Sequence, residues 1–363
     1  MAVTTLAQVA TSAAAALGVP GFDDAVGIGP ARHVVTCLVD GLGANLLARH
    51  AELAPRLASM TGAPISAVFP TTTPVGLGSF GTGLMPGVHG LVGASFLLPE
   101  SDQMLSPLQW GGDPVPVAVQ PEPTVFEAVA RSGVTMTTVS PEAYRESGLT
   151  RAVLRGGSYR GADTLDARLE QVGAILRSEA RSFTYVYWAE LDRTGHEFGV
   201  DSDEWRAALV RVDALVHGLA GTLPPGSALL VTADHGMVDC ARSERIQVDD
   251  RAALMAGVER IGGEPRARHI YTRLGAAADV ADAWQSEVGD VVRVMSRADV
   301  VASGLLGDVD AALADRIGDV MAVATGGAML ATRGDALVSS LIGQHGALTD
   351  DEVLIPALLH RPA

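Results

Sequence analysis

The sequence contains no lysine: all 26 basic residues are arginines. A lysine amine is needed for Schiff-base catalysis, for pyridoxal-phosphate chemistry and for the Walker-type phosphate loop, so these three classes are excluded. Asparagine is almost absent as well, because Asn45 is the only one. Any ligand must therefore be bound by positive charges other than lysine and almost entirely by hydrogen-bond donors other than asparagine.

Cysteines and uninterrupted apolar runs are also scarce. Cys37 and Cys240 are too few for a disulfide framework, and neither belongs to a CxxC pair. Residues 57–99 carry no Asp, Glu or Arg, but prolines and glycines interrupt them, so we interpret them as buried core and expect no membrane span. Residues 1–20 are alanine-rich without the basic start of a signal peptide, which predicts an amphipathic first helix and a cytoplasmic protein.

Acidic residues outnumber basic ones, 42 against 26, and give a formal net charge of -16. Non-specific binding to nucleic acids requires a field of cationic side chains facing phosphates, so no nucleic-acid polymer is expected as a partner. Docking on anionic lipid is disfavoured for the same reason. The sequence carries no signal for an oligomeric state.

Short apolar runs at residues 33–39, 184–188 and 228–232 alternate with helical patterns such as residues 167–179 and 205–220. Continuous apolar strands separated by helices indicate an α/β fold with a mainly parallel central sheet and helices on both faces. We further predict a helix over residues 44–60 and a strand over residues 322–332.

One catalytic domain over residues 1–363 is expected. The charge density rises over approximately residues 241–318, which contain a strand candidate of their own at residues 269–273. We therefore predict a small inserted α+β lobe in that stretch.

Polar groups that are able to bind metals follow four of the apolar runs. Asp40 follows the first run, Thr71, Thr72 and Thr73 follow Phe69-Pro70, and two further groups are Asp192 with His196 and Asp234 with His235. The carboxyl ends of parallel strands line one edge of a sheet, where ligands bind. Each pattern alone is common in turns, but their joint occurrence, together with His345, predicts one shared site.

This order of residues resembles the alkaline phosphatase superfamily and, more narrowly, the type I phosphodiesterase/nucleotide pyrophosphatase family. The segments that carry the resemblance are LVDGLG (38–43), FPTTTPVGLGSFGTGLMPGVHGLVG (69–93), ELDRTGHEFG (190–199), TADHGM (232–237) and GQHGALTDDE (343–352). The resemblance implies an alkaline phosphatase-like fold and two divalent metal ions, usually zinc.

By position, the resemblance implies that one ion is held by Asp40, Thr73, Asp234 and His235. The other ion would be held by Asp192, His196 and His345. Imidazole nitrogens and carboxylate oxygens suit zinc, and manganese or iron also fit this donor set.

Thr73 is the expected nucleophile, because the family places its Ser or Thr three residues after the proline of this motif. Pro74 suits the first position of a helix, which would make Thr73 the N-cap, with its hydroxyl beside free backbone N–H groups. The resemblance implies attack by Thr73 on phosphorus and a covalent phospho-threonine that water then hydrolyses.

The sequence departs from the family at one point. Many nucleotide pyrophosphatases carry an Asn shortly after the HG of the nucleophile segment, whereas this chain reads His89-Gly90-Leu91-Val92-Gly93-Ala94. Asn45, one turn after Asp40, is a candidate substitute for contacting the substrate, and His89 is interpreted as structural.

The leading interpretation is therefore a metal-dependent phosphodiesterase or nucleotide pyrophosphatase that acts on a small phosphate ester. A phosphomonoesterase and a phosphonoacetate hydrolase of the same superfamily are the alternatives. A sulfatase is disfavoured because no Cys-x-Pro-x-Arg motif occurs, and a phosphoglycerate mutase is disfavoured by length and by threonine at the nucleophile. The alternative from another class is a non-catalytic metal-binding protein of the same fold.

Overall fold

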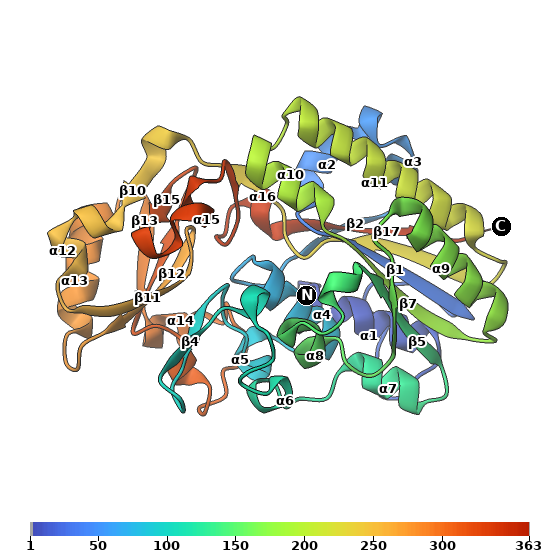
Figure 1. Cartoon of the computed structure of the whole chain (residues 1–363), viewed down its shortest axis with the longest axis horizontal. Helices are drawn as coiled ribbons and strands as arrows, with labels where there is room; N and C mark the ends of the chain where they lie inside the picture. The colour runs from blue at the N-terminus through green and yellow to red at the C-terminus, as the bar shows by residue number, and fades with distance from the viewer. Residues whose placement is uncertain (1–2, 363) are drawn as a thin grey trace.

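A seven-stranded sheet forms the centre of the larger part of the molecule (Figure 1). The computed structural model describes residues 3–362. The strand order is β2-β17-β8-β1-β7-β5-β6. The bounds are β1 (His33–Val39), β2 (Thr61–Ser66), β5 (Thr135–Ser140), β6 (Ser158–Gly161), β7 (Ser182–Trp188), β8 (Ser227–Thr232) and β17 (Leu354–His360). The run from β8 to β6 is parallel, and β17 pairs antiparallel with both β8 and β2. The predicted mainly parallel sheet is confirmed.

Helices cover both faces of this sheet (Figure 1). On one side lie α2 (Ala44–Arg49), α3 (Pro55–Ala58), α9 (Leu165–Ser178), α10 (Glu190–Phe198) and α11 (Asp203–Thr222). On the other lie α1 (Ala7–Ala16), α4 (Thr73–Thr82), α7 (Val125–Arg131) and α8 (Gly148–Val153). Because both faces are covered, every residue of β1, β7 and β8 is buried, which explains their continuous apolar sequences.

Short elements complete the larger part. They are α5 (Pro86–His89), α6 (Pro116–Val119), β3 (Phe96–Leu98), β4 (Gln103–Leu105) and α16 (Asp350–Val353). Two further short strands, β9 (Val238–Asp239) and β16 (Gly343–Gln344), pair with each other. Within residues 3–362, no helix combines the length and the apolar character needed to cross a membrane. The uncharged stretch at residues 57–99 instead supplies β2, the buried helix α4 and α5.

A second, antiparallel sheet lies at the left of Figure 1, in the order β11-β12-β14-β13. Its strands are β11 (Val258–Glu264), β12 (Ala267–Thr272), β13 (Val292–Ser296) and β14 (Val320–Ala324). Three helices belong to the same part of the chain: α12 (Ala252–Met255), α13 (Ala277–Val288) and α14 (Arg297–Ser303). This part has a separate apolar core, in which Trp284 is fully buried. A nearby two-stranded ladder joins β10 (Arg245–Gln247) to β15 (Met329–Ala331), and α15 (Ala336–Ser340) follows. Because β14 is part of the second sheet, this sheet continues beyond residue 318, where the sequence pattern had suggested an end.

Two predicted elements are wrong in their extent. The helix expected over residues 44–60 is two short helices: α2 ends at Arg49, and α3 begins at Pro55, a residue suited to the first position of a helix. The strand expected over residues 322–332 is two strands in different sheets, β14 and β15, separated by a turn that contains Gly326 at a φ of 51°. Gly326-Gly327 is the local signal of that turn.

Glu264, at the end of β11, is a buried carboxyl group of the second sheet. Its Oε2 atom accepts the N–H of Ala94 at 2.9 Å, whereas its Oε1 atom has no hydrogen-bond partner among residues 3–362. Burial raises the pKa of Glu264 from 4.5 to about 8, although the Ala94 N–H and the charge of Arg268 act in the opposite direction. The folded protein therefore holds this proton more tightly than the unfolded chain does.

The resulting stabilisation is present below the ordinary Glu pKa and is lost as the pH rises through about 8. The free energy of unfolding of the wild type should therefore fall as the pH rises from about 5 to about 9. Glu264→Gln has no charge to bury, so its free energy of unfolding should fall by roughly 2–4 kcal/mol less over the same range. Urea unfolding of both proteins across this range measures the difference. Glu259→Gln, an exposed change on the same strand, should follow the wild type, and identical curves for Glu264→Gln and the wild type would contradict the prediction.

Candidate metal centre

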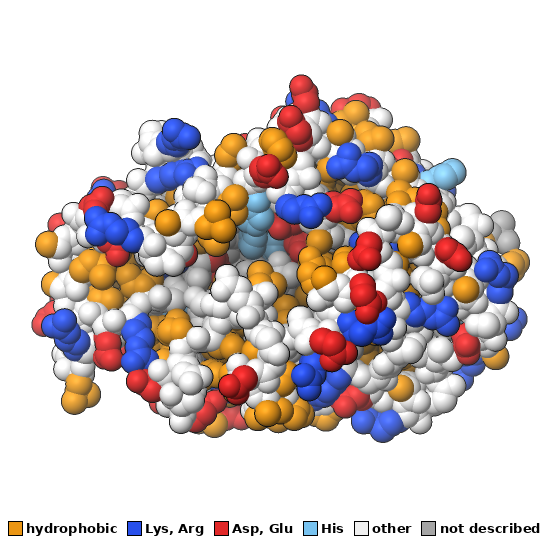
Figure 2. Space-filling model, in the orientation of Figure 1, with side chains coloured by type: hydrophobic (Ala, Val, Ile, Leu, Met, Phe, Trp, Pro, Cys, Tyr) orange, Lys and Arg blue, Asp and Glu red, His pale blue; other side chains and the backbone are white. Residues whose placement is uncertain are grey.

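Most residues of the candidate site lie at the carboxyl ends of three neighbouring strands. Strand β1 lies between β7 and β8, and all three run parallel. Asp40 follows β1, Asp234 and His235 follow β8, and Asp192 lies in α10 just after β7. Figure 2 shows histidine side chains at the bottom of a hollow between the two parts of the molecule.

Four buried side chains form a first group: Asp40, Thr73, Asp234 and His235, none of them more than 6% exposed. The Thr73 Oγ1 atom lies 3.5 Å from Asp40 Oδ2 and 3.3 Å from His235 Nε2. The His235 Nε2 atom in turn lies 3.4 Å from Asp40 Oδ1 and 3.7 Å from Asp234 Oδ2. Asp40 Oδ1 and Asp234 Oδ2 have no hydrogen-bond partner among residues 3–362. Buried carboxylate oxygens without partners are costly, so they mark positions where a cation fits.

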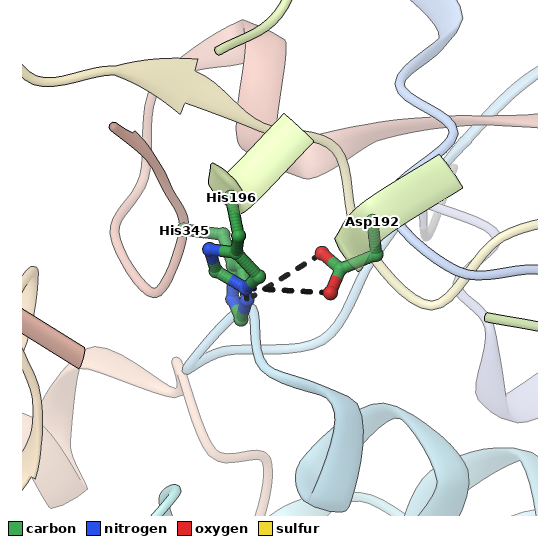
Figure 3. A group of neighbouring side chains, drawn as sticks. All are labelled: Asp192, His196 and His345. Carbon is green, nitrogen blue, oxygen red and sulfur yellow. Dashed lines mark hydrogen bonds and ion pairs between the residues drawn. The ribbon is translucent and has the colours of Figure 1, made fainter. Parts of the chain in front are cut away.

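Asp192, His196 and His345 form a second group (Figure 3). Asp192 and His196 are one turn apart on α10, whereas His345 comes from the loop after β16. The Asp192 Oδ2 atom lies 3.3 Å from His196 Nε2, and Asp192 Oδ1 lies 3.8 Å from His345 Nε2. The rings of His345 and His235 stack with centroids 3.7 Å apart, which places the two groups side by side.

Backbone carbonyl oxygens orient the three imidazoles. Each Nδ1 atom lies within 2.9 Å of one of them: His196 pairs with Gly343, His235 with Gly236 and His345 with Thr71. A carbonyl only accepts, so each Nδ1 carries a hydrogen, and Nε2 is the ring nitrogen left to bind an ion in the site. The Nε2 atoms of His196 and His345 are 3.2 Å apart. Two lone pairs at that distance repel each other unless a cation lies between or beside them.

Charges within the site lead to the same conclusion. The pKa of Asp40 is well above its usual range because the group is buried and because Asp234 and Asp192 lie nearby, although the Tyr187 hydroxyl donates to Asp40 Oδ2. Burial also raises the pKa of Asp234. The pKa of His345 is well below its usual range because of burial and of the two neighbouring imidazoles. The donor set of carboxylate oxygens and neutral imidazole nitrogens therefore fits divalent ions such as zinc, manganese or iron.

Thr73 does not cap its helix, contrary to the expectation from the sequence. Thr72 is the N-cap, with φ −140° and ψ 147°, and Thr73 is the first residue of α4. Neither threonine makes a side-chain cap, since the Thr73 hydroxyl faces Asp40 and His235 instead. Thr71 has a different role, because its hydroxyl donates to the carbonyl of Ala347 and accepts the N–H of Gly346.

A tyrosine pocket beside the first group was not found from the sequence. This cavity of about 280 Å³ reaches Asp40, Thr73 and Asp192, and its walls include Tyr144, Tyr159, Tyr185 and Tyr187. Tyr185 and Tyr187 are two residues apart in β7 and share a face of the sheet, and this spacing just before Asp192 is the signal that could have revealed them. Tyr144 and Tyr159 come from separate loops and strands, and nothing in their local sequence distinguishes them.

The other substrate-binding candidate lies elsewhere. The side-chain amide of Asn45 donates to Asp351 Oδ1 at 2.9 Å, and Asn45 lines a shallow recess with Asp239 and Asp350 instead of the tyrosine pocket. His89 is buried, is hydrogen-bonded to Ser79 through Nε2 at 3.0 Å, and belongs to neither group.

The chain matches the sequence profile of the type I phosphodiesterase/nucleotide pyrophosphatase family over residues 34–348, and it therefore belongs to that family. The family consists of hydrolases of phosphodiester and pyrophosphate bonds. A phosphopentomutase of Anaeromyxobacter dehalogenans is 27% identical over 172 residues, which cover 47% of this chain and 42% of that protein. Human bis(5'-adenosyl)-triphosphatase ENPP4 is 26% identical over 100 residues, covering 25% of this chain and 22% of that protein. The chain thus aligns with less than half the length of either relative.

Solved structures share the fold over nearly the whole chain. Murine ectonucleotide pyrophosphatase/phosphodiesterase 5 superposes with a TM-score of 0.72 at 18% identity, covering 91% of this chain and 88% of that one. The human protein of the same name gives 0.71 at 19% identity, with the same coverage of both chains. At this level of identity the likeness establishes the fold.

Because carboxylates and imidazole lone pairs face one another in both groups, we expect divalent ions to stabilise the folded chain. An ion at 100 times its dissociation constant adds about 2.7 kcal/mol per site. Thermal unfolding of chelator-treated protein, with and without zinc, manganese or iron, should show a rise of several degrees, reduced in His196→Ala. His217→Ala, an exposed change on α11, is the matched control and should respond as the wild type does. No rise with any of these ions would contradict this interpretation of the cluster.

Proposed function

We propose that this member of the family hydrolyses phosphodiester or pyrophosphate bonds with two divalent ions, most simply zinc, and with Thr73 as the nucleophile. The observation that carries this proposal is the position of the Thr73 hydroxyl. Its Oγ1 atom lies within 3.5 Å of both Asp40 and His235, beside the second group of Asp192, His196 and His345. In this proposal Asp40, Thr73, Asp234 and His235 hold one ion, and the second group holds the other.

The divalent ions would supply the positive charge that favours the ionised hydroxyl of Thr73 and the anionic oxygens of the phosphoryl group. Thr73 Oγ1 then attacks phosphorus, so that the Oγ1–P bond forms, the bond to the leaving oxygen breaks, and the leaving group takes up a proton. Water later cleaves the phospho-threonine and restores the hydroxyl. As the first residue of α4, Thr73 has no intrahelical acceptor for its own N–H, which is therefore available to a phosphoryl oxygen.

The tyrosine pocket supports a diester substrate over a monoester. It opens beside Thr73 and Asp192, and its 280 Å³ gives room for an organic group of about nucleoside size. Aromatic and hydroxyl groups dominate its walls, and Arg193 is the one cationic residue among them. Such walls suit a ring that stacks and forms hydrogen bonds, whereas a monoester would leave the pocket unused.

Two of the similar proteins agree with this substrate class. The human relative carries the name bis(5'-adenosyl)-triphosphatase, and an inactive threonine-to-alanine variant of the murine protein has been solved in complex with AMP. Both facts concern those proteins, and they support a nucleotide as the first substrate to test here.

The nucleophile is tested by Thr73→Ala. Since no other hydroxyl occupies its position, we expect a loss of roughly 10³-fold or more in kcat on a nucleotide diester, whereas Thr73→Ser should retain measurable turnover. Rapid quenching followed by mass spectrometry of the wild type should place a phosphoryl group on the peptide that contains Thr73. Thr82→Ala, at the other end of α4, is the control for helix damage. Full turnover in Thr73→Ala would refute the covalent mechanism.

The role of the pocket is tested by Tyr144→Ala. Tyr144 is 41% exposed, so its removal should leave folding intact, and its ring packs edge-on against Tyr187 at 6.1 Å. Loss of a stacking wall costs about 1–3 kcal/mol per base, so KM for a nucleotide diester should rise about 5- to 100-fold, while Tyr144→Phe stays near the wild type. The KM for p-nitrophenyl phosphate should not change. Equal effects on both substrates, or a wild type that prefers the monoester, would reverse the assignment to a diesterase.

A further inference from the structure

The turn between β11 and β12 reaches from the second sheet into the larger part of the molecule. Arg266 lies on this turn, is 0% exposed, and pairs with Glu352, which is also fully buried. The contact is bidentate, since Arg266 Nε donates to Glu352 Oε1 at 2.7 Å and Arg266 Nη2 donates to Oε2 at 2.8 Å. Two more guanidinium donors are used by the carbonyl oxygens of Ala328 and Gly326, at 2.6 and 2.9 Å.

Glu352 is also the residue that shapes the loop carrying His345. Its Oε1 atom accepts the N–H of Ala347 at 2.9 Å, and its Oε2 atom accepts the hydroxyl of Thr349 at 2.7 Å. One carboxylate therefore fixes both the segment that directly follows His345 and the start of α16. Because Arg266 holds both oxygens of that carboxylate, it determines the orientation in which Glu352 presents them.

The loop is held from its other side as well. Gly346 donates its N–H to the Thr71 hydroxyl at 3.0 Å, and the carbonyl oxygen of Thr71 lies 2.8 Å from His345 Nδ1. Glu264, from the same hairpin as Arg266, packs on Gly346 so closely that a Cβ atom there would lie 2.6 Å from Glu264 Cγ. The imidazole of His345 is thus aimed by a chain of contacts that begins in the second sheet.

We propose that Arg266 is a positioning residue for the ion of the second group: through Glu352 it fixes His345, so the second sheet acts on the affinity of this metal centre more than on that of the other. This inference rests on the proposed function in requiring that Asp192, His196 and His345 hold an ion. Contacts that orient a metal ligand commonly affect affinity by 10- to 100-fold, and a bidentate arginine is the group best suited to fixing a carboxylate.

Geometry distinguishes Arg266 from an ordinary buried charge. A lysine at this position keeps the positive charge but loses the fork that binds both Glu352 oxygens and two carbonyls at once. Arg266→Lys should therefore weaken positioning without leaving Glu352 as an unpaired buried charge, which Arg266→Met would do. Arg268→Lys is the matched control, because Arg268 is buried in β12 but binds the Leu330 carbonyl and Asp335 instead of the His345 loop.

The experiment is a titration of metal-free, full-length wild type and variants with zinc against a competing chelator, repeated with cobalt(II), whose visible spectrum reports the ligands of each ion. His345→Ala identifies which of the two dissociation constants belongs to the second group. In Arg266→Lys we expect that constant to rise about 10- to 100-fold, with a changed cobalt spectrum, while the other constant changes clearly less, since Glu352 reaches the first group only through its backbone carbonyl and the N–H of Gly236. Arg268→Lys should change neither, whatever it does to the free energy of unfolding.

Two results would overturn the proposal. If Arg266→Lys and Arg268→Lys lower the free energy of unfolding alike and leave both zinc constants unchanged, Arg266 has only a structural role. If Arg266→Lys weakens the binding of both ions equally, the substitution loosens the structure in general and Arg266 does not act on His345 in particular. Failure of the proposed function looks different, because the wild type itself would then bind fewer than two ions per chain or show no hydrolysis of diesters.

Discussion

Three carboxylates that meet in one small, partly buried space impose the main electrostatic constraint on this molecule. Asp40, Asp192 and Asp234 are brought together because β7, β1 and β8 are parallel neighbours whose carboxyl ends coincide. Burial and mutual repulsion raise the pKa of Asp40 and Asp234, so ionisation of the set requires positive charge nearby. With no lysine in the sequence, divalent ions are the simplest source of that charge. The same constraint explains why an acidic protein of net charge -16 is proposed to act on an anionic substrate.

Features determined by continuous local sequence could be predicted. Strand β1 occupies residues 33–39 as expected, because a β-branched run that ends in Asp-Gly has few other structures open to it. The structure also brings together the seven residues proposed as ligands, since each follows a buried strand or belongs to a motif of fixed spacing. The division of residues 44–60 and the turn at Gly326 were predicted wrongly although the sequence signals both, since Pro55 interrupts the first stretch and Gly326-Gly327 interrupts the second.

Features assembled from distant segments lay beyond the sequence. The tyrosine pocket combines residues from β5, β6, β7, α8 and α10, and of its four tyrosines only the pair in β7 shares a local pattern. Thr73 illustrates an intermediate case: Pro74 correctly predicted a helix start, but the cap moved to Thr72. This shift of one residue releases the Thr73 hydroxyl from capping and turns it toward Asp40 and His235. A hydroxyl that capped its own helix would be committed to backbone N–H groups and less available as a nucleophile.

The pairing of Arg266 with Glu352 links the two parts of the chain through charges that neither part could bury alone. Replacing both charged side chains of such a pair by apolar groups is often neutral or stabilising. Stability by itself therefore does not explain why a buried arginine and a buried glutamate meet here. The directionality of the hydrogen bonds explains it. A carboxylate that is fixed at both oxygens can itself hold two segments of the chain in place, whereas an apolar contact cannot. Docking of the second sheet and ordering of the His345 loop therefore become one event. The larger part supplies Asp192 and His196 from a rigid helix, whereas the third member of that group depends on a loop whose shape is completed from the other sheet.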